Sequence, residues 1–164
     1  IASTVFKEYF NPEEIPCYGI DGITKGIIES AKKEGKTIRL LGHITKENEG
    51  YSLYVSPAFV SKDSFFGGTI YELNAATASF KNNGVLSFKG PGAGRYPTAS
   101  AILQDIERIV HGYQMELADL KGEAKILKNL EGTFACYEKN KETKVVLHNP
   151  NADELKNFAA VIKE

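Results

Sequence analysis

The stretch that decides the fold covers residues 85–101 and reads VLSFKGPGAGRYPTASA. Its first four residues, Val85–Phe88, are mostly apolar and predict a strand. A glycine-rich loop follows over residues 90–94. A helix is predicted over residues 98–117, because apolar residues recur there at steps of three and four. Pro97 suits the first turn of that helix, where its missing N–H removes no hydrogen bond.

From its residues alone, the loop over 90–94 has two interpretations. A loop between a strand and a helix directs backbone N–H groups and the helix N-terminus toward a ligand bound in the loop, which suits a phosphate or a polarised carbonyl. Bare glycine also lets the backbone approach a flat ring closely. The spacing fits neither a G-x-G-x-x-G fingerprint nor a P-loop. A tight turn that requires positive φ twice explains the composition equally well, so both interpretations stay open.

The two residues after the loop carry similar alternatives. Arg95 could reach a phosphate group, or it could only cap the loop or form an ion pair at the surface. For Tyr96 the alternatives are a packing aromatic residue and a general acid, and we favour the packing role. On the long helix, Asp105 and Glu107 are two positions apart and point to different faces, so they do not form an acid/base pair.

Two hairpins are expected before the loop. Strands over 37–45 and 51–56 form the first, which Pro57 closes because proline cannot donate to a central ladder. Strands over 69–80 and 85–88 form the second, around the turn sequence Asn82-Asn83-Gly84.

Further elements complete the predicted fold. A helix capped by Thr24 is expected to run to about Lys33. In the tail, a hairpin is expected from strands at 133–137 and 144–147, and a last amphipathic helix over 153–162. Together these elements predict the α+β class: a mixed or antiparallel sheet built from hairpins, with helices packed on one face and a small α+β extension at the C-terminus.

The composition is that of a globular protein with balanced charge. The sequence has 20 Lys and Arg residues and 21 Asp and Glu residues, which gives a net charge of −1 over 164 residues. This balance argues against a nucleic acid or an anionic membrane as partner. Cys17 and Cys136 lie far apart, as expected for two free, buried thiols in a reducing cytosol. The three histidines, His43, His111 and His148, have no metal-ligand spacing, so no metal site is predicted.

The glycine loop and its continuation carry a resemblance to a known family. Residues 90–101, continuing to Asp105, closely resemble the signature at the end of the catalytic domain of homoserine dehydrogenases. Upstream segments agree in order: Gly19-Ile20, Ile23-Thr24, Ala31, Gly35, Ile38–Gly42, Val55-Ser56-Pro57 and Asn74-Ala75. The resemblance covers roughly residues 15–112. Ile27 departs from it, where the family often has an acidic residue, and so does Tyr71, where a glycine is common.

The resemblance implies an activity and a site. The family reversibly reduces L-aspartate 4-semialdehyde to L-homoserine with the reduced form of NAD or NADP, in the pathway to threonine, methionine and isoleucine. Its glycine loop lies against the nicotinamide cofactor, which implies Gly92, Ala93 and Gly94 as cofactor-binding residues through their backbone. A cytoplasmic homodimer is also implied, with homoserine or aspartate semialdehyde as its small-molecule substrate and with neither nucleic acid nor membrane as partner.

The resemblance also implies which parts of the enzyme lie outside these residues. The family's Rossmann domain and its catalytic lysine, in a Glu-x-Asp-Pro…Asp…Lys stretch, precede the matched region. No residue of this chain is therefore assigned as catalytic, and the chain alone is expected to be inactive. Residues 1–117 are interpreted as the C-terminal part of the catalytic and dimerisation domain, and 118–164 as an extension of unknown function. A non-enzymatic dimerisation or regulatory module that kept the fold is the alternative.

Overall fold

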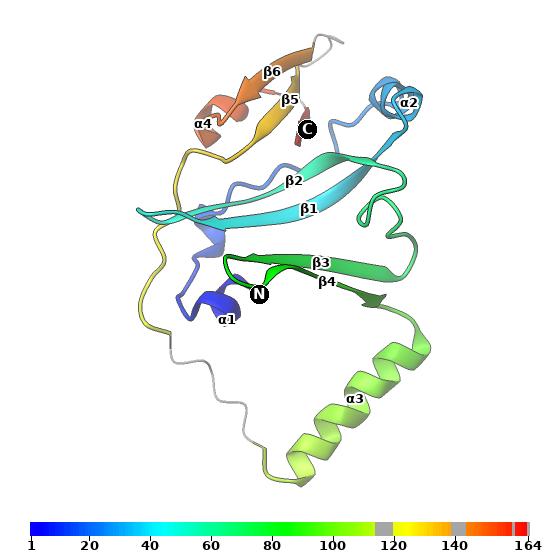
Figure 1. Ribbon diagram of the computed structural model, residues 1–164, viewed down its shortest axis with the longest axis vertical. Helices are drawn as coiled ribbons and strands as arrows, with labels where there is room; N and C mark the ends of the chain where they lie inside the picture. The colour runs from blue at the N-terminus through cyan, green and yellow to red at the C-terminus, as the bar shows by residue number, and fades with distance from the viewer. Residues whose placement is uncertain (114–119, 139–143, 159, 164) are drawn as a thin grey trace. The chain divides into compact units, whose positions relative to one another are not determined.

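A computed structural model describes residues 1–113, 120–138, 144–158 and 160–163. The chain forms two compact units (Figure 1), one from residues 1–61 and 118–164 and one from residues 62–117. The first unit contains α1 (Ala2–Phe6), the 3-10 helix η1 (Pro12–Glu14), α2 (Lys25–Lys33), β1 (Lys36–Lys46), β2 (Tyr51–Ser61), β5 (Thr133–Tyr137), β6 (Lys144–His148), α4 (Ala152–Leu155) and β7 (Ala160–Lys163). The second contains β3 (Leu73–Phe80), β4 (Gly84–Pro91) and α3 (Arg95–Val110). The predicted α+β class is confirmed.

The first hairpin is formed by β1 and β2, as predicted, but β2 does not end at Pro57. It continues to Ser61, and Pro57 faces Leu40 in the ladder. The pairing starts at the turn, where Glu47 N–H donates to the Gly50 carbonyl. Hydrogen-bonded and non-hydrogen-bonded pairs alternate from there, which makes Leu40–Pro57 a non-hydrogen-bonded pair. The missing N–H of proline therefore costs this ladder nothing.

The C-terminal segment completes a five-stranded sheet with the first hairpin, in the order β1-β2-β7-β5-β6. β7 lies parallel to β2, with Ala58 opposite Lys163, and antiparallel to β5. The chain before β5 also runs beside β2, since Leu127 N–H donates to the Tyr51 carbonyl at 2.8 Å. Residues 118–164, interpreted from the sequence as an extension, are grouped in one compact unit with residues 1–61.

In the tail, one prediction is confirmed and one is wrong. β5 and β6 pair as the predicted hairpin, whose turn at 139–143 lies outside the described residues. The expected helix over 153–162 is limited to the single turn of α4, and β7 follows it. The apolar pattern of this segment indicated a helix because Val161 and Ile162 are adjacent and both buried. A strand covered on both faces buries consecutive residues and loses the alternation that marks it in sequence.

Two helices pack on the five-stranded sheet from opposite sides, where a single helical layer was expected. Ile27 of α2 shares a buried cluster with Ile162, whereas Leu155 of α4 shares one with Val161. Successive strand residues point to opposite faces, so α2 and α4 cover different faces. The start of α2 is as predicted: the Thr24 hydroxyl accepts the Ile27 N–H at 3.4 Å.

The second unit consists of the predicted β3–β4 hairpin followed by α3. The helix ends at Val110, before Gly112, whose φ of 70° is left-handed and stops a helix. The expected helix over 98–117 is therefore shorter at its C-terminal end, and residues 114–117 lie outside the described ones. Every residue of α3 is at least partly exposed. No helix within the described ranges is long and apolar enough to cross a membrane.

One residue before β3 has a backbone conformation unusual for its type. Tyr71 has φ 54°, in the left-handed region that glycine adopts freely, and its side chain is 92 % exposed. This is the position where the resemblance makes a glycine common. Tyrosine therefore carries backbone strain here and gains no packing within the chain.

We predict that Tyr71→Gly stabilises the hairpin by about 0.5–1 kcal/mol, because glycine relieves the strain and loses some of that gain to unfolded-state entropy. Hydrogen exchange of the β3 and β4 amides would measure this, since it reports opening of the second unit itself. Tyr71→Ala is the matched control and should change the exchange rates little. Equal stabilisation by both substitutions would show that φ at residue 71 is not the cause.

Candidate functional site

The glycine loop joins β4 to α3 and consists of three residues. The sequence placed it over 90–94, but Gly90 and Pro91 still belong to β4 and pair with Asn74 and Leu73. The loop proper is Gly92, Ala93 and Gly94, and all three residues are exposed. The three residues implied as cofactor-binding are therefore the ones that the fold leaves open.

Gly92 is tied to the start of β3. Its N–H donates to the Glu72 carbonyl at 2.7 Å. A Cβ at this position would overlap the side-chain amide of Asn74. Glycine at 92 therefore leaves room for the Asn74 side chain to lie against the loop, and a larger residue would displace it.

Gly94 is required for a different reason, which is its backbone conformation. It has φ 107° and is the N-cap of α3, a helix of 16 residues. An L-residue rarely adopts this φ. Gly94 has no side chain with which to cap the helix, so the N–H groups of Arg95 and Tyr96 are available to an anion or a carbonyl oxygen. The tight-turn interpretation expected positive φ twice, but within residues 90–94 only Gly94 has it. The loop therefore has one conformational glycine together with an open donor surface.

The residues that follow the loop contact each other. The Arg95 guanidinium carbon lies 4.6 Å from the centre of the Tyr96 ring. Tyr96 is 72 % exposed, so it packs little within the chain beyond the contact with Arg95. The expected packing role is therefore only partly confirmed.

Two residues to which the sequence analysis assigned no role hold the loop's surroundings. Lys89 Nζ donates to the Phe65 carbonyl at 2.7 Å and lies 4.4 Å from the centre of the Phe65 ring. Lys89 therefore connects β4 to the corner at Phe65, in the segment between β2 and β3. Asn74 lies against Gly92. In the sequence Asn74 appeared only as part of the family resemblance, and the hairpin register, with a turn at 81–83, places it opposite Gly90.

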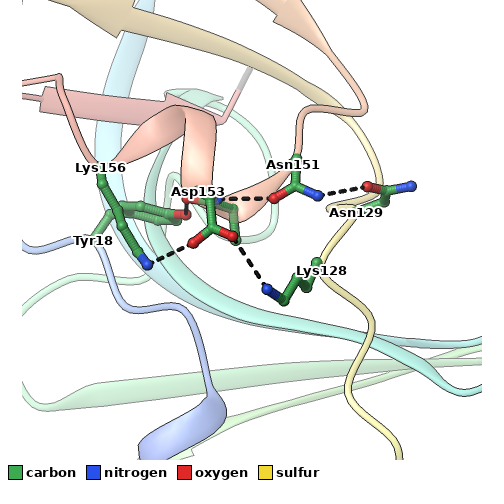
Figure 2. Close-up of polar contacts among 7 residues, drawn as sticks. Tyr18, Lys128, Asn129, Asn151, Asp153 and Lys156 are labelled. Carbon is green, nitrogen blue, oxygen red and sulfur yellow. Dashed lines mark hydrogen bonds and ion pairs between the residues drawn. The ribbon is translucent and has the colours of Figure 1, made fainter.

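The first unit contains a pocket of about 470 Å³ beside α4. It is lined by Glu13, Glu14, Ile15, Pro16, Cys17, Tyr18, Ile126, Leu127, Lys128, Ala152, Asp153 and Lys156. Figure 2 shows that Asp153 binds two lysines, Lys156 at 2.6 Å and Lys128 at 3.3 Å. The lysines at the rim are thus already paired with a carboxylate of the chain.

The remaining contacts in Figure 2 join α4 to the chain around it. Tyr18 donates to the Ala152 carbonyl at 3.4 Å, and burial raises the pKa of Tyr18 to about 12. Asn151 Nδ2 donates to Asn129 Oδ1 at 3.2 Å. The side chain of Asn151 also caps α4. The polar cluster is therefore a junction that fixes α4 against the N-terminal segment and the chain before β5.

Both cysteines are free, as predicted. Cys136 is buried, and burial raises its pKa to about 11. Cys17 is exposed, so the expectation that both thiols are buried is wrong for this one. It lies in the segment that meets β2 through a bridge to Val55, and this segment runs along the surface of the unit.

The three histidines have separate partners. His43 lies 3.1 Å from the Thr45 hydroxyl and 3.5 Å from a Glu131 carboxylate oxygen, and burial lowers its pKa. His111 contacts the Glu107 carbonyl and His148 the Thr133 hydroxyl. Across the ranges that the structure describes, no three His, Cys, Asp or Glu side chains are grouped as a metal would require.

Comparison with known proteins places this loop in a family. Residues 1–106 match the sequence model described as homoserine dehydrogenase. The chain belongs to the homoserine dehydrogenase family. The homoserine dehydrogenase of Lactococcus lactis is 32 % identical over 110 residues, which cover 67 % of this chain and 26 % of that protein. The NAD(+)-dependent homoserine dehydrogenase of Pseudomonas canavaninivorans is 29 % identical, over 66 % of this chain and 31 % of that protein.

Solved structures of the family share the fold. A homoserine dehydrogenase from S. aureus matches with a TM-score of 0.61 at 24 % identity, over 87 % of this chain and 36 % of that one. One from Thiobacillus denitrificans matches with a TM-score of 0.58 at 21 % identity, over 76 % of this chain and 33 % of that one. The chain spans about a quarter to a third of the length of the relatives it matches.

The loop geometry predicts different costs for a methyl group at two glycines. Gly94→Ala should destabilise the start of α3 by about 1–2 kcal/mol, because alanine is strained at this φ. Gly90→Ala is the control and should change stability by less than about 0.5 kcal/mol, since nothing lies within 4 Å of its Cβ position. Hydrogen exchange of the α3 amides measures both. Equal costs at the two positions would contradict the assignment of Gly94 as a conformational glycine.

Proposed function

We propose that this chain is the C-terminal part of the catalytic and dimerisation domain of a homoserine dehydrogenase. The complete enzyme interconverts L-homoserine and L-aspartate 4-semialdehyde with NAD or NADP, in the biosynthesis of threonine, methionine and isoleucine in the cytoplasm. The observation that carries the proposal is the loop Gly92–Gly94, which is open and free of large side chains at the start of α3 in a chain of this family.

The cofactor assignment to Gly92, Ala93 and Gly94 is supported by what the loop offers. Two glycines and an alanine leave a backbone surface against which a flat ring can lie at van der Waals distance. The uncapped first turn of α3 adds N–H donors. These are the properties that a nicotinamide site requires, so the residues fit the group.

In this proposal the chain contributes binding and orientation. When bound, a nicotinamide cofactor supplies the hydride acceptor or donor. Gly92 and Gly94 let the ring approach the backbone, Ala93 limits its position, and Lys89 holds the corner at Phe65 beside β4. Holding the ring at a fixed place next to the substrate carbon lowers the entropic part of the barrier. The groups that move protons and bind the substrate's charges belong to the rest of the enzyme.

We also propose that the complete enzyme is a homodimer built on the second unit. The hairpin face that contains Phe80, Leu86 and Phe88 is apolar and exposed. On α3, exposed apolar side chains recur at Ile102, Leu103, Ile106, Ile109 and Val110. A two-stranded hairpin is only marginally stable alone, and contiguous exposed apolar surface marks an interaction site. A second copy of the chain would bury this surface.

The function is tested by adding bulk to the loop without straining it. Ala93 is exposed and has no positive φ, so Ala93→Leu should fold normally. In the complete enzyme it should raise the KM for NAD or NADP, or lower kcat, by about tenfold or more, because the side chain fills the space of the ring. Steady-state kinetics of homoserine oxidation measure this effect.

Two comparisons make that test decisive. Ala101→Leu places the same side chain on exposed α3 surface outside the loop and should leave the kinetics unchanged. The 164-residue chain alone should show no homoserine-dependent reduction of NAD or NADP. Unchanged kinetics in Ala93→Leu would remove the loop from the cofactor site. Absence of turnover in the complete protein would favour the non-enzymatic module.

The dimer is tested by charge on the apolar hairpin face. Phe88→Glu in the complete protein should halve the mass measured by light scattering, because a carboxylate cannot be buried there without a partner. Val85→Glu is the matched control on the opposite face of the hairpin and should leave the dimer intact. A monomeric wild-type protein would contradict the proposal.

A further inference from the structure

Asn74 is a polar exception on an apolar surface. In the β3–β4 ladder it shares a face with Ala76, Ala78 and Phe80 of its own strand. Its partner across the ladder is Gly90, directly before the loop. The amide is exposed, so a polar group of a ligand can bind it in place of water.

The Asn74 side chain lies directly against the loop. The space that a Cβ of Gly92 would occupy is taken by the Asn74 amide. The loop is held in this place by the hydrogen bond from Gly92 N–H to the Glu72 carbonyl at 2.7 Å. Glycine at 92 therefore gives the Asn74 amide room at the edge of the open backbone surface.

The hydrogen-bonding capacity of this amide is unused within the chain. Asn74 is exposed, and among the residues that the structure describes no hydrogen bond to its Oδ1 or Nδ2 occurs. One acceptor and one NH₂ donor group are thus open beside Gly92. Asn83, an exposed asparagine in the turn of the same hairpin, lies at the far end of the ladder from the loop.

We propose that Asn74 orients the carboxamide of a nicotinamide ring on the Gly92–Gly94 loop, an inference that rests on the proposed function. A carboxamide carries one carbonyl acceptor and one NH₂ donor group, so two amides can bond reciprocally. The carboxamide is attached to C3 of the ring, next to C4, which exchanges the hydride. Fixing the carboxamide therefore fixes the direction in which C4 points.

The experiment compares NAD with its 3-acetylpyridine analogue, in which a methyl group replaces the NH₂ of the carboxamide. In the complete enzyme, kcat/KM for both is measured for wild type, Asn74→Ala and Asn83→Ala. For each protein, kcat/KM with NAD is divided by kcat/KM with the analogue. Comparing this quotient between variant and wild type cancels the different intrinsic reactivities of the two compounds. Asn74→Ala should lose about 3- to 10-fold of the wild-type preference for NAD, the worth of one hydrogen bond. Asn83→Ala should keep the full preference.

A conservative variant keeps the test valid if the alanine variant folds poorly. Asn74→Asp has the same shape and still accepts from the carboxamide NH₂, so it should retain the preference for NAD over the analogue. Its lost NH₂ group should lower kcat/KM with both compounds. If Asn74→Ala changes both cofactors equally, or neither, Asn74 has no contact with the carboxamide and the inference is overturned. If wild type oxidises homoserine with neither compound nor with NADP, the proposed function itself fails.

Discussion

The turn from β4 into α3 depends on glycine at residue 94, and glycine at residue 92 lets the Asn74 side chain lie against the loop. At 92 the reason is space, because the amide of Asn74 lies where a Cβ would be. At 94 the reason is conformation, because φ 107° is accessible mainly to glycine. The two constraints act together on three consecutive residues and leave the backbone of the loop exposed at the start of a helix. The candidate site follows from this local geometry.

The rest of the second unit holds the loop in place. The hairpin register sets Asn74 opposite Gly90, and the hydrogen bond to the Glu72 carbonyl fixes Gly92. Lys89 secures the preceding corner through Phe65. These contacts are few and mostly exposed, and the unit keeps much of its apolar surface open. Such a unit gains most of its stability from what covers it, which agrees with a role inside a larger assembly.

The first unit is stabilised differently, by a sheet whose centre comes from the end of the chain. β7 lies between β2 and β5, and Val161 and Ile162 are buried on its two faces. The sequence predicted a helix here because consecutive apolar residues, read without a partner strand, match a helical pattern as well as a buried strand. The strands of the first hairpin and the cap at Thr24 were predictable because their signals are local. The placement of β7 depends on residues about 100 positions away and was not.

The candidate site likewise has residues that local sequence signals point to and residues whose role depends on strand pairing. Gly92 and Gly94 stood out in the sequence, since glycine between a strand and a helix signals special geometry. The separate reasons for the two glycines become clear only from the paired strands and the φ angle at residue 94. Asn74 appeared in the sequence only as part of the family resemblance, and its place beside the loop arises only where β3 and β4 are paired. At Pro57 a local rule was wrong. Proline lacks an N–H and predicted the end of the strand, but it lies at a non-hydrogen-bonded pair of the ladder, so the strand continues.

The central claim is that the open backbone at 92–94 receives a nicotinamide ring. A crystal structure of the complete enzyme with NAD or NADP tests it most directly. The account predicts the ring in van der Waals contact with the backbone of Gly92–Gly94, about 4 Å away. A ring bound elsewhere, with the loop covered by other side chains of the enzyme, would contradict it.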